Sequence, residues 1–303
     1  MKRVPQIGWL ADGSRLHLQD GPIDLIVEGS GSEANVRAAY KAAARRFDGL
    51  LDELCGELAL LRQAADPKCC LLQGIVARRM HAAVAPFASE HFITPMAAVA
   101  GAVAEEILGA MLGAARLQRA YVNNGGDIAL HLDDGEQFTV GLMDRPDSDG
   151  LMWTMIIDAD DPSRGVATSG RHGRSFSLGI ADAVTVLART ASQADAAATI
   201  IANAVDLPGH PGIVRCPAQD LQPDSDLGAR LVTRDVGELS AGEIDDALEA
   251  GAIFARKLLA SDLIDGAALR LQGETVLVAS RMIETRGLRT AFKSDTRESA
   301  MHV

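Results

Sequence analysis

Strand-like and helix-like segments occur in separate blocks along this chain, and that order limits the folds available to it. Strand patterns cover residues 6–28, 120–170, 183–187 and 267–279, and helix patterns cover residues 32–65, 75–85, 95–117, 192–205 and 241–259. A parallel sheet would need strands and helices in regular alternation. The sequence therefore predicts an α+β fold, with antiparallel sheets packed against long helices in one domain over residues 1–285. Residues 286–303 are charged and lack periodicity, so we expect a mobile tail.

The first long helix is predicted from a continuous apolar stripe. Apolar side chains recur at steps of three and four from Val36 to Leu61, and the opposite face is charged. Residues 30–32 open the segment and residues 66–67 end it, which predicts one uninterrupted helix. A later helix is expected to start at residues 94–95, where threonine suits the N-cap and proline suits the first helical position.

Charge and composition argue against nucleic acid and membranes as partners. The formal net charge is −12, and an acidic surface repels both phosphate backbones and anionic lipid headgroups. The most apolar long stretch, residues 93–115, carries Glu105 and Glu106 at its centre, which disfavours a membrane span. No apolar run follows the first residues, so we expect a cytoplasmic protein. The apolar helix faces suit either a core or the interface of a homo-oligomer.

A glycine pair follows one of the strand patterns. Gly125 and Gly126 permit positive φ angles and leave backbone N–H groups uncovered, so a phosphate or a ring of a ligand can approach closely. Asn123, Asn124 and Asp127 add polar side chains at the same edge. The alternative is a plain tight turn in which these side chains bond to their own backbone.

A cationic loop lies further along, at residues 164–174. It combines hydroxyls, glycines, a histidine and flanking arginines in a chain that is otherwise acidic. Arginine forks and exposed N–H groups suit a phosphate or a pyrophosphate. The alternative is a polar surface loop. The candidate ligand-binding residues of the loop are Thr168, Ser169, Gly170, Arg171 and His172.

Asp195 and Thr199 lie four residues apart in the helix pattern at 192–205, so they share one helical face. A carboxylate and a hydroxyl one turn apart suit a hard cation such as Mg²⁺, which prefers oxygen ligands. The alternative is that Asp195 is favoured by the dipole near the helix N-terminus and that Thr199 bonds back to the helix.

Together, the three segments resemble the ApbE-like superfamily, the FAD:protein FMN transferases. That family has a strand leading into an Asn-x-Gly-Gly-Asp/Glu turn, then an Ala-Thr-Ser-Gly element, then a helix with Ala-Asp-Ala-x-x-Thr. This chain has the same elements in the same order at residues 123–127, 167–170 and 194–199. The resemblance extends over residues 93–206 and implies an ApbE-like architecture related to the T-fold.

The resemblance also implies a role for each segment. In the family, the helical aspartate and threonine bind Mg²⁺ beside the FAD pyrophosphate, which points to Asp195 and Thr199. The glycine turn lies along the flavin nucleotide, and the Thr-Ser-Gly element borders the same cleft. The implied cofactors are Mg²⁺ and either FAD or FMN. The implied partners are a flavin or another nucleotide, and a protein acceptor.

Two stretches depart from the family pattern. Ala100 stands where the family has a lysine, and Glu105 stands in place of the acid that follows it. Leu178 stands where the family has a functional histidine, and Asp182 is one position out of register with the family's aspartate. Asp182 and Glu105 are therefore the candidate catalytic bases. The pattern resembles a divergent bacterial and archaeal branch of the family, whose activity the motifs do not define.

Three functions are compatible with these motifs. The first is Mg²⁺-dependent handling of a flavin nucleotide, by FMN transfer or by cleavage of the FAD pyrophosphate. The second is a non-catalytic cofactor-binding or assembly protein on the same fold, which the leucine in place of histidine favours. The third is an enzyme for a non-flavin substrate, since aromatic residues make up 4% of the chain and few can stack on a flavin ring.

Overall fold

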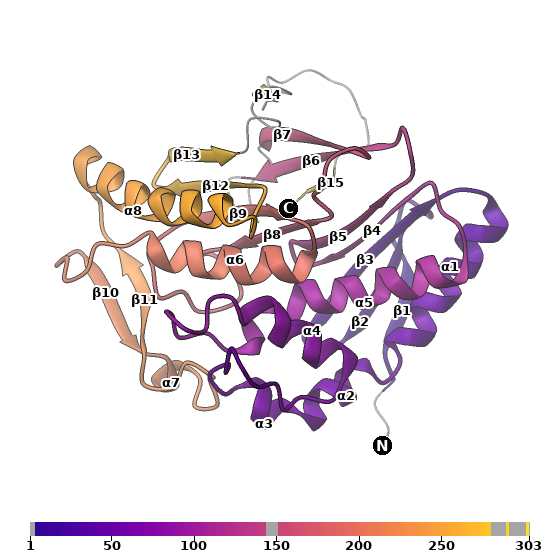
Figure 1. Ribbon diagram of the computed structural model, residues 1–303, viewed down its shortest axis with the longest axis horizontal. Coiled ribbons are helices and arrows are strands. Elements are labelled where there is room, and N and C mark those ends of the chain that lie inside the picture. Colours follow the sequence, from indigo (N-terminus) through magenta and orange to yellow (C-terminus); the bar gives the residue numbers. More distant parts are fainter. Residues whose placement is uncertain (1–3, 144–150, 280–288, 291–300, 303) are drawn as a thin grey trace.

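A nine-stranded antiparallel sheet is the centre of the fold (Figure 1). The computed structural model describes residues 4–143, 151–279, 289–290 and 301–302. The strand order is β1-β2-β3-β4-β5-β8-β9-β12-β13, and each neighbouring pair is antiparallel. The strands are β1 (Gln6–Trp9), β2 (Leu16–Asp20), β3 (Ile23–Ser30), β4 (Arg119–Asn124), β5 (Asp127–Leu132), β8 (Gly165–Ser169), β9 (Ala183–Ala188), β12 (Gly266–Leu271) and β13 (Glu274–Ala279).

Four long helices pack against this sheet, in the order α8, α6, α5 and α1 from the β13 edge towards the β1 edge (Figure 1). They are α1 (Glu33–Phe47), α5 (Val99–Ala114), α6 (Ala191–Ala204) and α8 (Ala241–Ala260). Shorter helices surround them, namely α2 (Leu50–Gly56), α3 (Leu58–Leu61), α4 (Ile75–Val84), the 3₁₀ helix η1 (Pro95–Ala98) and α7 (Ala218–Leu221). The predicted α+β class, with antiparallel sheets and long helices, is confirmed.

A β-hairpin covers part of the other face of the sheet. It consists of β6 (Gln137–Met143) and β7 (Leu151–Asp158), and the short strands β14 (Arg289–Thr290) and β15 (Met301–His302) pair with its outer edges. Its apolar side chains form a second core with residues from β4, β5, β8 and β9. Apart from β14 and β15, the predicted tail lies outside the described residues.

The segment between β9 and β12 leaves the main sheet and returns to it. It forms the separate two-stranded sheet of β10 (Ile213–Pro217) and β11 (Leu231–Val236), with α7 in the connection between the two strands (Figure 1). Ser240 then caps α8 through a capping box with Glu243. β12 pairs with β9, so the excursion does not interrupt the antiparallel order of the main sheet.

The predicted first long helix is broken, which corrects the continuous helix inferred from its stripe. Ser32 caps α1 as the sequence suggests, but α1 ends at Phe47 and α2 begins at Leu50. Between them, Gly49 has a φ of 85°, and a residue in that left-handed region cannot continue a right-handed helix. The stripe did not reveal the break because Leu50 is fully buried beyond it, as Phe47 is before it.

The segment Pro95–Ala114 is long and apolar enough to cross a membrane, by length and composition only. In the structure, α5 instead lies between α1 and α6 and packs against β4 and β5 (Figure 1). Its two central glutamates form ion pairs with arginines of α1 and α4. These contacts are those of a core helix that covers a sheet.

The contact between α5 and α6 is close because α5 has a glycine where the two helices meet. A Cβ atom added to Gly101 would lie 2.3 Å from the carbonyl oxygen of Ala191 and 2.7 Å from the nitrogen of Ser192. Both are backbone atoms, so they cannot move aside as a flexible side chain does. The start of α5 is therefore held directly against the start of α6.

We expect Gly101→Ala to lower the free energy of unfolding by about 3 kcal/mol, because one helix must move to relieve the overlap. Gly109→Ala is the matched control on the same helix, since no atom lies within 4 Å of the added Cβ. The control should be neutral or should stabilise the helix by up to about 1 kcal/mol. Urea unfolding measures both variants, and equal midpoints for the two would contradict this account of the helix contact.

Candidate functional site

The segments that the sequence singled out meet beside the first turns of α5 and α6. The turn between β4 and β5 and the end of β8 come from the sheet, and α5 and α6 pack over these strands. In Figure 1 one end of α6 meets one end of α5, and the two helices extend away from each other over the sheet. The antiparallel order brings these elements together because β8 pairs directly with β5 after the hairpin excursion.

The glycine turn has the backbone that its sequence predicts. Gly125 and Gly126 have φ angles of 66° and 110°, and Asn124 pairs with Asp127 across the turn. Asn123 bonds to its own turn, since its Oδ1 accepts from the N–H of Gly126 at 2.8 Å. Asn124 instead reaches the helical layer, and its Nδ2 donates to a carbonyl at the start of α5. The tight-turn alternative therefore describes Asn123 but not Asn124.

Two carboxyl groups, those of Asp127 and Asp195, interact electrostatically between the sheet and α6. Burial, and next the negative charge of Asp195, raise the pKa of Asp127 well above its usual range. Burial raises the pKa of Asp195 to about 7, although hydrogen bonds from the N–H groups of Gly101 and Ala100 lower it. Burial disfavours the charged form of both carboxyl groups, and the charge of Asp195 adds to this effect at Asp127, so a proton or a cation is needed to compensate them.

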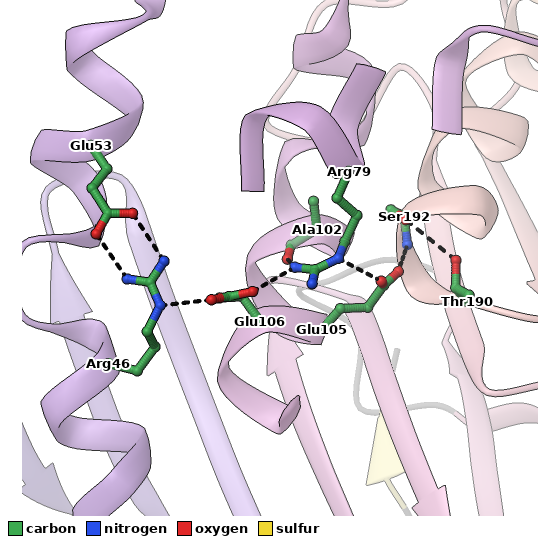
Figure 2. Close-up of polar contacts among 8 residues, drawn as sticks. All are labelled: Arg46, Glu53, Arg79, Ala102, Glu105, Glu106, Thr190 and Ser192. Carbon is green, nitrogen blue, oxygen red and sulfur yellow. Dashed lines mark hydrogen bonds and ion pairs between the residues drawn. The ribbon is translucent and has the colours of Figure 1, made fainter. Parts of the chain in front are cut away.

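Asp195 also caps a helix other than its own. Its Oδ2 accepts from the N–H of Gly101 at 3.0 Å, in the first turn of α5, where the N-cap residue Ala98 provides no side-chain acceptor. In return, Oε1 of Glu105 on α5 accepts from the N–H of Ser192 at 2.6 Å, in the first turn of α6 (Figure 2). The two helices therefore cap each other, a contact that neither the metal-binding interpretation of Asp195 nor the helix-dipole alternative included.

Glu105 belongs to a chain of ion pairs that joins four helices (Figure 2). Nε of Arg79 on α4 lies 3.1 Å from Oε2 of Glu105, and its Nη1 lies 2.9 Å from Oε2 of Glu106. Nε of Arg46 on α1 lies 2.7 Å from the other oxygen of Glu106 and also pairs with Glu53 on α2. Both oxygens of Glu105 are thus engaged, so the structure gives it a capping role. Its catalytic role stays a prediction.

Asp182 accepts hydrogen bonds from two residues of the loop after β8 and from one residue of the β12–β13 turn. Nε and Nη2 of Arg171 lie 2.8 and 2.7 Å from its Oδ1, and Nε2 of His172 lies 3.1 Å from the same oxygen. The N–H of Gln272, in the β12–β13 turn, donates to its Oδ2 at 2.5 Å. Two of the residues that were predicted to bind a phosphate, Arg171 and His172, are therefore bonded to Asp182, and their role at a phosphate stays a prediction. Its catalytic role stays a prediction too.

The Thr-Ser-Gly element is divided between the two faces of the sheet. The N–H of Thr168 donates to Oδ1 of Asp127 at 3.3 Å, while its hydroxyl lies 2.8 Å from that of Thr185. Because side chains alternate along a strand, Ser169 projects to the opposite face from Thr168. A Cβ at Gly170 would lie 2.4 Å from the carbonyl oxygen of Asp182. Gly170 is therefore needed for the loop to pack against the start of β9.

Asp127, Asp195 and Thr199 bear oxygen atoms of the kind that a Mg²⁺ ion prefers. Asp127 and Asp195 supply the charge, and the half-buried Thr199 follows Asp195 by one helical turn. Within the described part of the chain, the buried Oδ1 of Asn124 has no hydrogen-bond partner, so one further oxygen remains available. The described residues hold no cluster of three or more His, Cys, Asp or Glu. Neutral oxygens and waters would therefore complete the ligand set, as Mg²⁺ commonly requires.

Sequence reasoning missed two contributors to this site. The carbonyl of Ala100 accepts from Asn124, at the position where the family pattern has a lysine. Arg174 lies against Gly125, with its Nη2 2.1 Å from where a Cβ would stand. No sequence signal identifies the carbonyl, because any residue supplies one. Arg174 could have been singled out as the last cation of the glycine-rich loop.

The raised pKa values predict how the stability of the metal-free protein depends on pH. A carboxyl group whose pKa is higher in the folded state keeps a proton that the unfolded chain has already released. Its contribution to stability is fully present below the unfolded pKa of about 3.9. It is lost as the pH rises to the folded value, which for Asp195 is about 7.

We therefore expect the free energy of unfolding in EDTA to fall from about pH 4 to about pH 7, by up to about 1.4 kcal/mol per unit for one carboxyl group. Urea unfolding at several pH values measures this slope. Asp195→Asn should flatten it, because the amide does not titrate. An unchanged slope in that variant would show that other groups control the pH dependence.

A protein-family model described as AbpE bacteria matches residues 7–277, which is most of the chain. The chain belongs to this family. The resemblance inferred from the three motifs is thereby confirmed, and the match extends on both sides of residues 93–206.

Among curated proteins, the chain is similar to UPF0280 proteins over part of their length. A UPF0280 protein of Methanothermobacter thermautotrophicus is 41% identical over 117 residues, which cover 38% of this chain and 44% of that protein. A UPF0280 protein of Methanopyrus kandleri is 41% identical over 128 residues, which cover 42% of this chain and 48% of that protein. The chain spans about half the length of the curated relatives it matches.

The solved structures that align with this chain have low sequence identity to it. A variant of the flavin transferase ApbE from Vibrio cholerae aligns with a TM-score of 0.49 at 11% identity, over 90% of this chain and 99% of that chain. The apo form of the Pseudomonas stutzeri flavinyl transferase ApbE aligns with a TM-score of 0.42 at 11% identity, over 93% and 96%. At these values the alignments do not equate individual residues.

Proposed function

We propose that this AbpE-family protein binds Mg²⁺ and the pyrophosphate of a flavin dinucleotide between the β4–β5 turn and α6. The observation that carries the proposal is the meeting of two carboxyl groups between the sheet and the helices, where Asp127 accepts from the N–H of Thr168 and Asp195 accepts from the N–H of Gly101. Burial there raises the pKa of both carboxyl groups. A divalent cation would compensate both charges at once, and a pyrophosphate would then complete its ligands. The flavin part of the proposal is supported by the motifs that the chain shares with the FMN transferases.

The residues around this pair would hold the ion and the nucleotide. Asp127, Asp195 and Thr199 would provide oxygen ligands, and the unpaired Oδ1 of Asn124 would be a further acceptor. No atom lies within 4 Å of a Cβ added at Gly126, so the nucleotide can lie along the backbone of the turn there, next to the guanidinium of Arg174 on Gly125. When bound, Mg²⁺ would neutralise pyrophosphate charge and act as a Lewis acid on a phosphoryl oxygen.

Two reactions fit such a site. In FMN transfer, the bond between the two phosphates of FAD breaks, AMP leaves, and the FMN phosphate joins a hydroxyl of a protein acceptor. In pyrophosphate cleavage, water takes the place of that hydroxyl, and FMN and AMP are released. Both reactions require a group that accepts the proton of the attacking hydroxyl or water.

One observation favours a second candidate, a cofactor-binding or assembly protein without turnover. Both predicted bases are engaged, since Glu105 caps α6 and pairs with Arg79, and Asp182 accepts from Arg171 and a backbone N–H. Leu178 replaces the family's histidine, and in the structure its N–H donates to Asn203. The two bases predicted from the sequence would then be occupied by other contacts while the site held a nucleotide.

Incubation of the protein with FAD and Mg²⁺, followed by chromatography of the products, tests these alternatives. Release of AMP with FMN indicates cleavage, and release of AMP with FMN bound to an added acceptor protein indicates transfer. Tight binding of FAD without products supports the binding protein. Absence of both binding and turnover for FAD, with and without Mg²⁺, would contradict the proposed function, and thermal-shift screening of other nucleotides would then identify a non-flavin ligand.

A further inference from the structure

The two arginines of the loop after β8 differ in what they contact. Arg171 is mostly buried, and two of its nitrogens are bonded to Asp182. Arg174 is exposed, and its one hydrogen bond among the described residues is from Nη1 to the carbonyl oxygen of Pro22 at 3.3 Å. In the same part of the chain, it forms no ion pair within 4.0 Å. Most of its five N–H donors are therefore free for a ligand.

Arg174 is also the arginine that lies at the proposed nucleotide site. Its guanidinium rests on the backbone of Gly125, in the turn that carries Asp127. It is close enough to Asp127 for its positive charge to lower the pKa of that carboxyl group, against the larger effect of burial. It therefore brings a cation from the β8–β9 loop to the junction of the β2–β3 and β4–β5 turns.

The present contact of Arg174 is weak compared with what an anion would offer. A hydrogen bond of 3.3 Å to a neutral carbonyl is slightly longer than the usual N–H···O distance. A guanidinium binds phosphate oxygens through shorter, charge-assisted and often bidentate hydrogen bonds. Exchange of the Pro22 carbonyl for a phosphate would therefore be favourable, and it would need only a rotation of an exposed side chain.

We propose that Arg174 is the residue that recognises the phosphate of the substrate, and that it makes this site selective for phosphorylated flavins over riboflavin. The inference rests on the proposed function and adds to it the side chain that binds the phosphate. It also gives a reason for glycine at position 125, because a side chain there would occupy the place of the guanidinium. Arg171 and His172, the expected phosphate-binding residues, instead shape the loop through Asp182.

The test compares the affinities of three ligands for Arg174→Gln and for the wild-type protein, with Mg²⁺ present. Isothermal titration with FAD, FMN and riboflavin separates the phosphate from the ring. We expect the affinity for FAD and FMN to fall at least about tenfold and the affinity for riboflavin to stay unchanged. Arg256→Gln removes the same charge from an exposed pair on α8 and should leave all three affinities unchanged.

Two results would overturn the inference while the proposed function stands. One is wild-type affinity of Arg174→Gln for FAD. The other is an equal loss of affinity for riboflavin, which would make Arg174 a support for the site as a whole. If the wild-type protein binds no flavin nucleotide, the proposed function fails, and inorganic pyrophosphate with Mg²⁺ becomes the probe. Weaker pyrophosphate binding by Arg174→Gln would then support the inference, and unchanged or absent binding would overturn it.

Discussion

Replacement of Asp195 by asparagine is expected to abolish Mg²⁺-dependent binding of FAD while the fold is retained. The amide has nearly the shape of the carboxylate, and its oxygen still accepts from the N–H of Gly101. It lacks the negative charge that a Mg²⁺ ligand provides, so the affinity for Mg²⁺ should fall by about 100-fold or more. In EDTA at about pH 8 the variant should be at least as stable as the wild type, because repulsion with Asp127 is removed.

Asp195→Ala separates the metal-binding role of this residue from its capping role. Alanine removes the acceptor for the first turn of α5 as well as the charge, which is expected to lower the free energy of unfolding by about 1–2 kcal/mol. Titration with Mg²⁺ and urea unfolding measure the two effects independently. If Asp195→Asn binds Mg²⁺ and FAD as the wild type does, and only Asp195→Ala is impaired, then Asp195 is a helix cap and no metal ligand.

The second large effect is expected at Asp182, where Asp182→Ala should lower the free energy of unfolding by about 3–5 kcal/mol. The side chain of Asp182 is 12% exposed and that of Arg171 is 18% exposed, so removal of the carboxylate leaves a largely buried guanidinium without its counter-ion. The N–H of Gln272 also loses its acceptor, which disconnects the β12–β13 turn from the loop after β8. Chemical unfolding measures the loss.

Two further variants show whether this loss of stability comes from the buried ion pair. Glu249→Ala breaks an arginine–carboxylate ion pair whose partners are both about half exposed, and it should change stability by less than about 1 kcal/mol. Asp182→Asn keeps an acceptor for Gln272 and removes only the charge. If it retains stability but loses turnover of FAD, Asp182 is a base, as the sequence suggested. If Asp182→Ala is no less stable than Glu249→Ala, the buried cluster does not hold the loop.

The sequence predicted which helices and strands the fold contains, but it did not predict where the first long helix is interrupted. Alternating apolar residues and paired glycines marked the β4–β5 hairpin, and Ser32 marked the start of α1. The break between α1 and α2 escaped notice because the stripe of apolar residues continues across Gly49. Periodicity reports which residues are buried, and two short helices in sequence can bury the same residues as one long helix.

The sequence predicted which residues form the candidate site, but it did not predict which of them contact one another. The motifs named Asp127 and Asp195, but their interaction depends on β5 and α6 packing together, which no local pattern encodes. The reciprocal caps by Asp195 and Glu105 join residues about ninety positions apart in sequence. The sequence correctly indicated a cluster of positive charges in the loop after β8. The assignment of that charge to a ligand or to Asp182 required the geometry of Arg171 and Arg174.

The most direct test of the carboxylate pair as a Mg²⁺ site for FAD is a calorimetric titration of FAD into the wild-type protein, with Mg²⁺ and with EDTA. The same titration is made with Asp127→Asn and with Asp195→Asn, which keep the shapes of the two side chains. We predict saturable binding of FAD to the wild type in Mg²⁺, and none in EDTA or in either variant. Equally tight binding of FAD in EDTA, or by both variants, would contradict the central role of this pair.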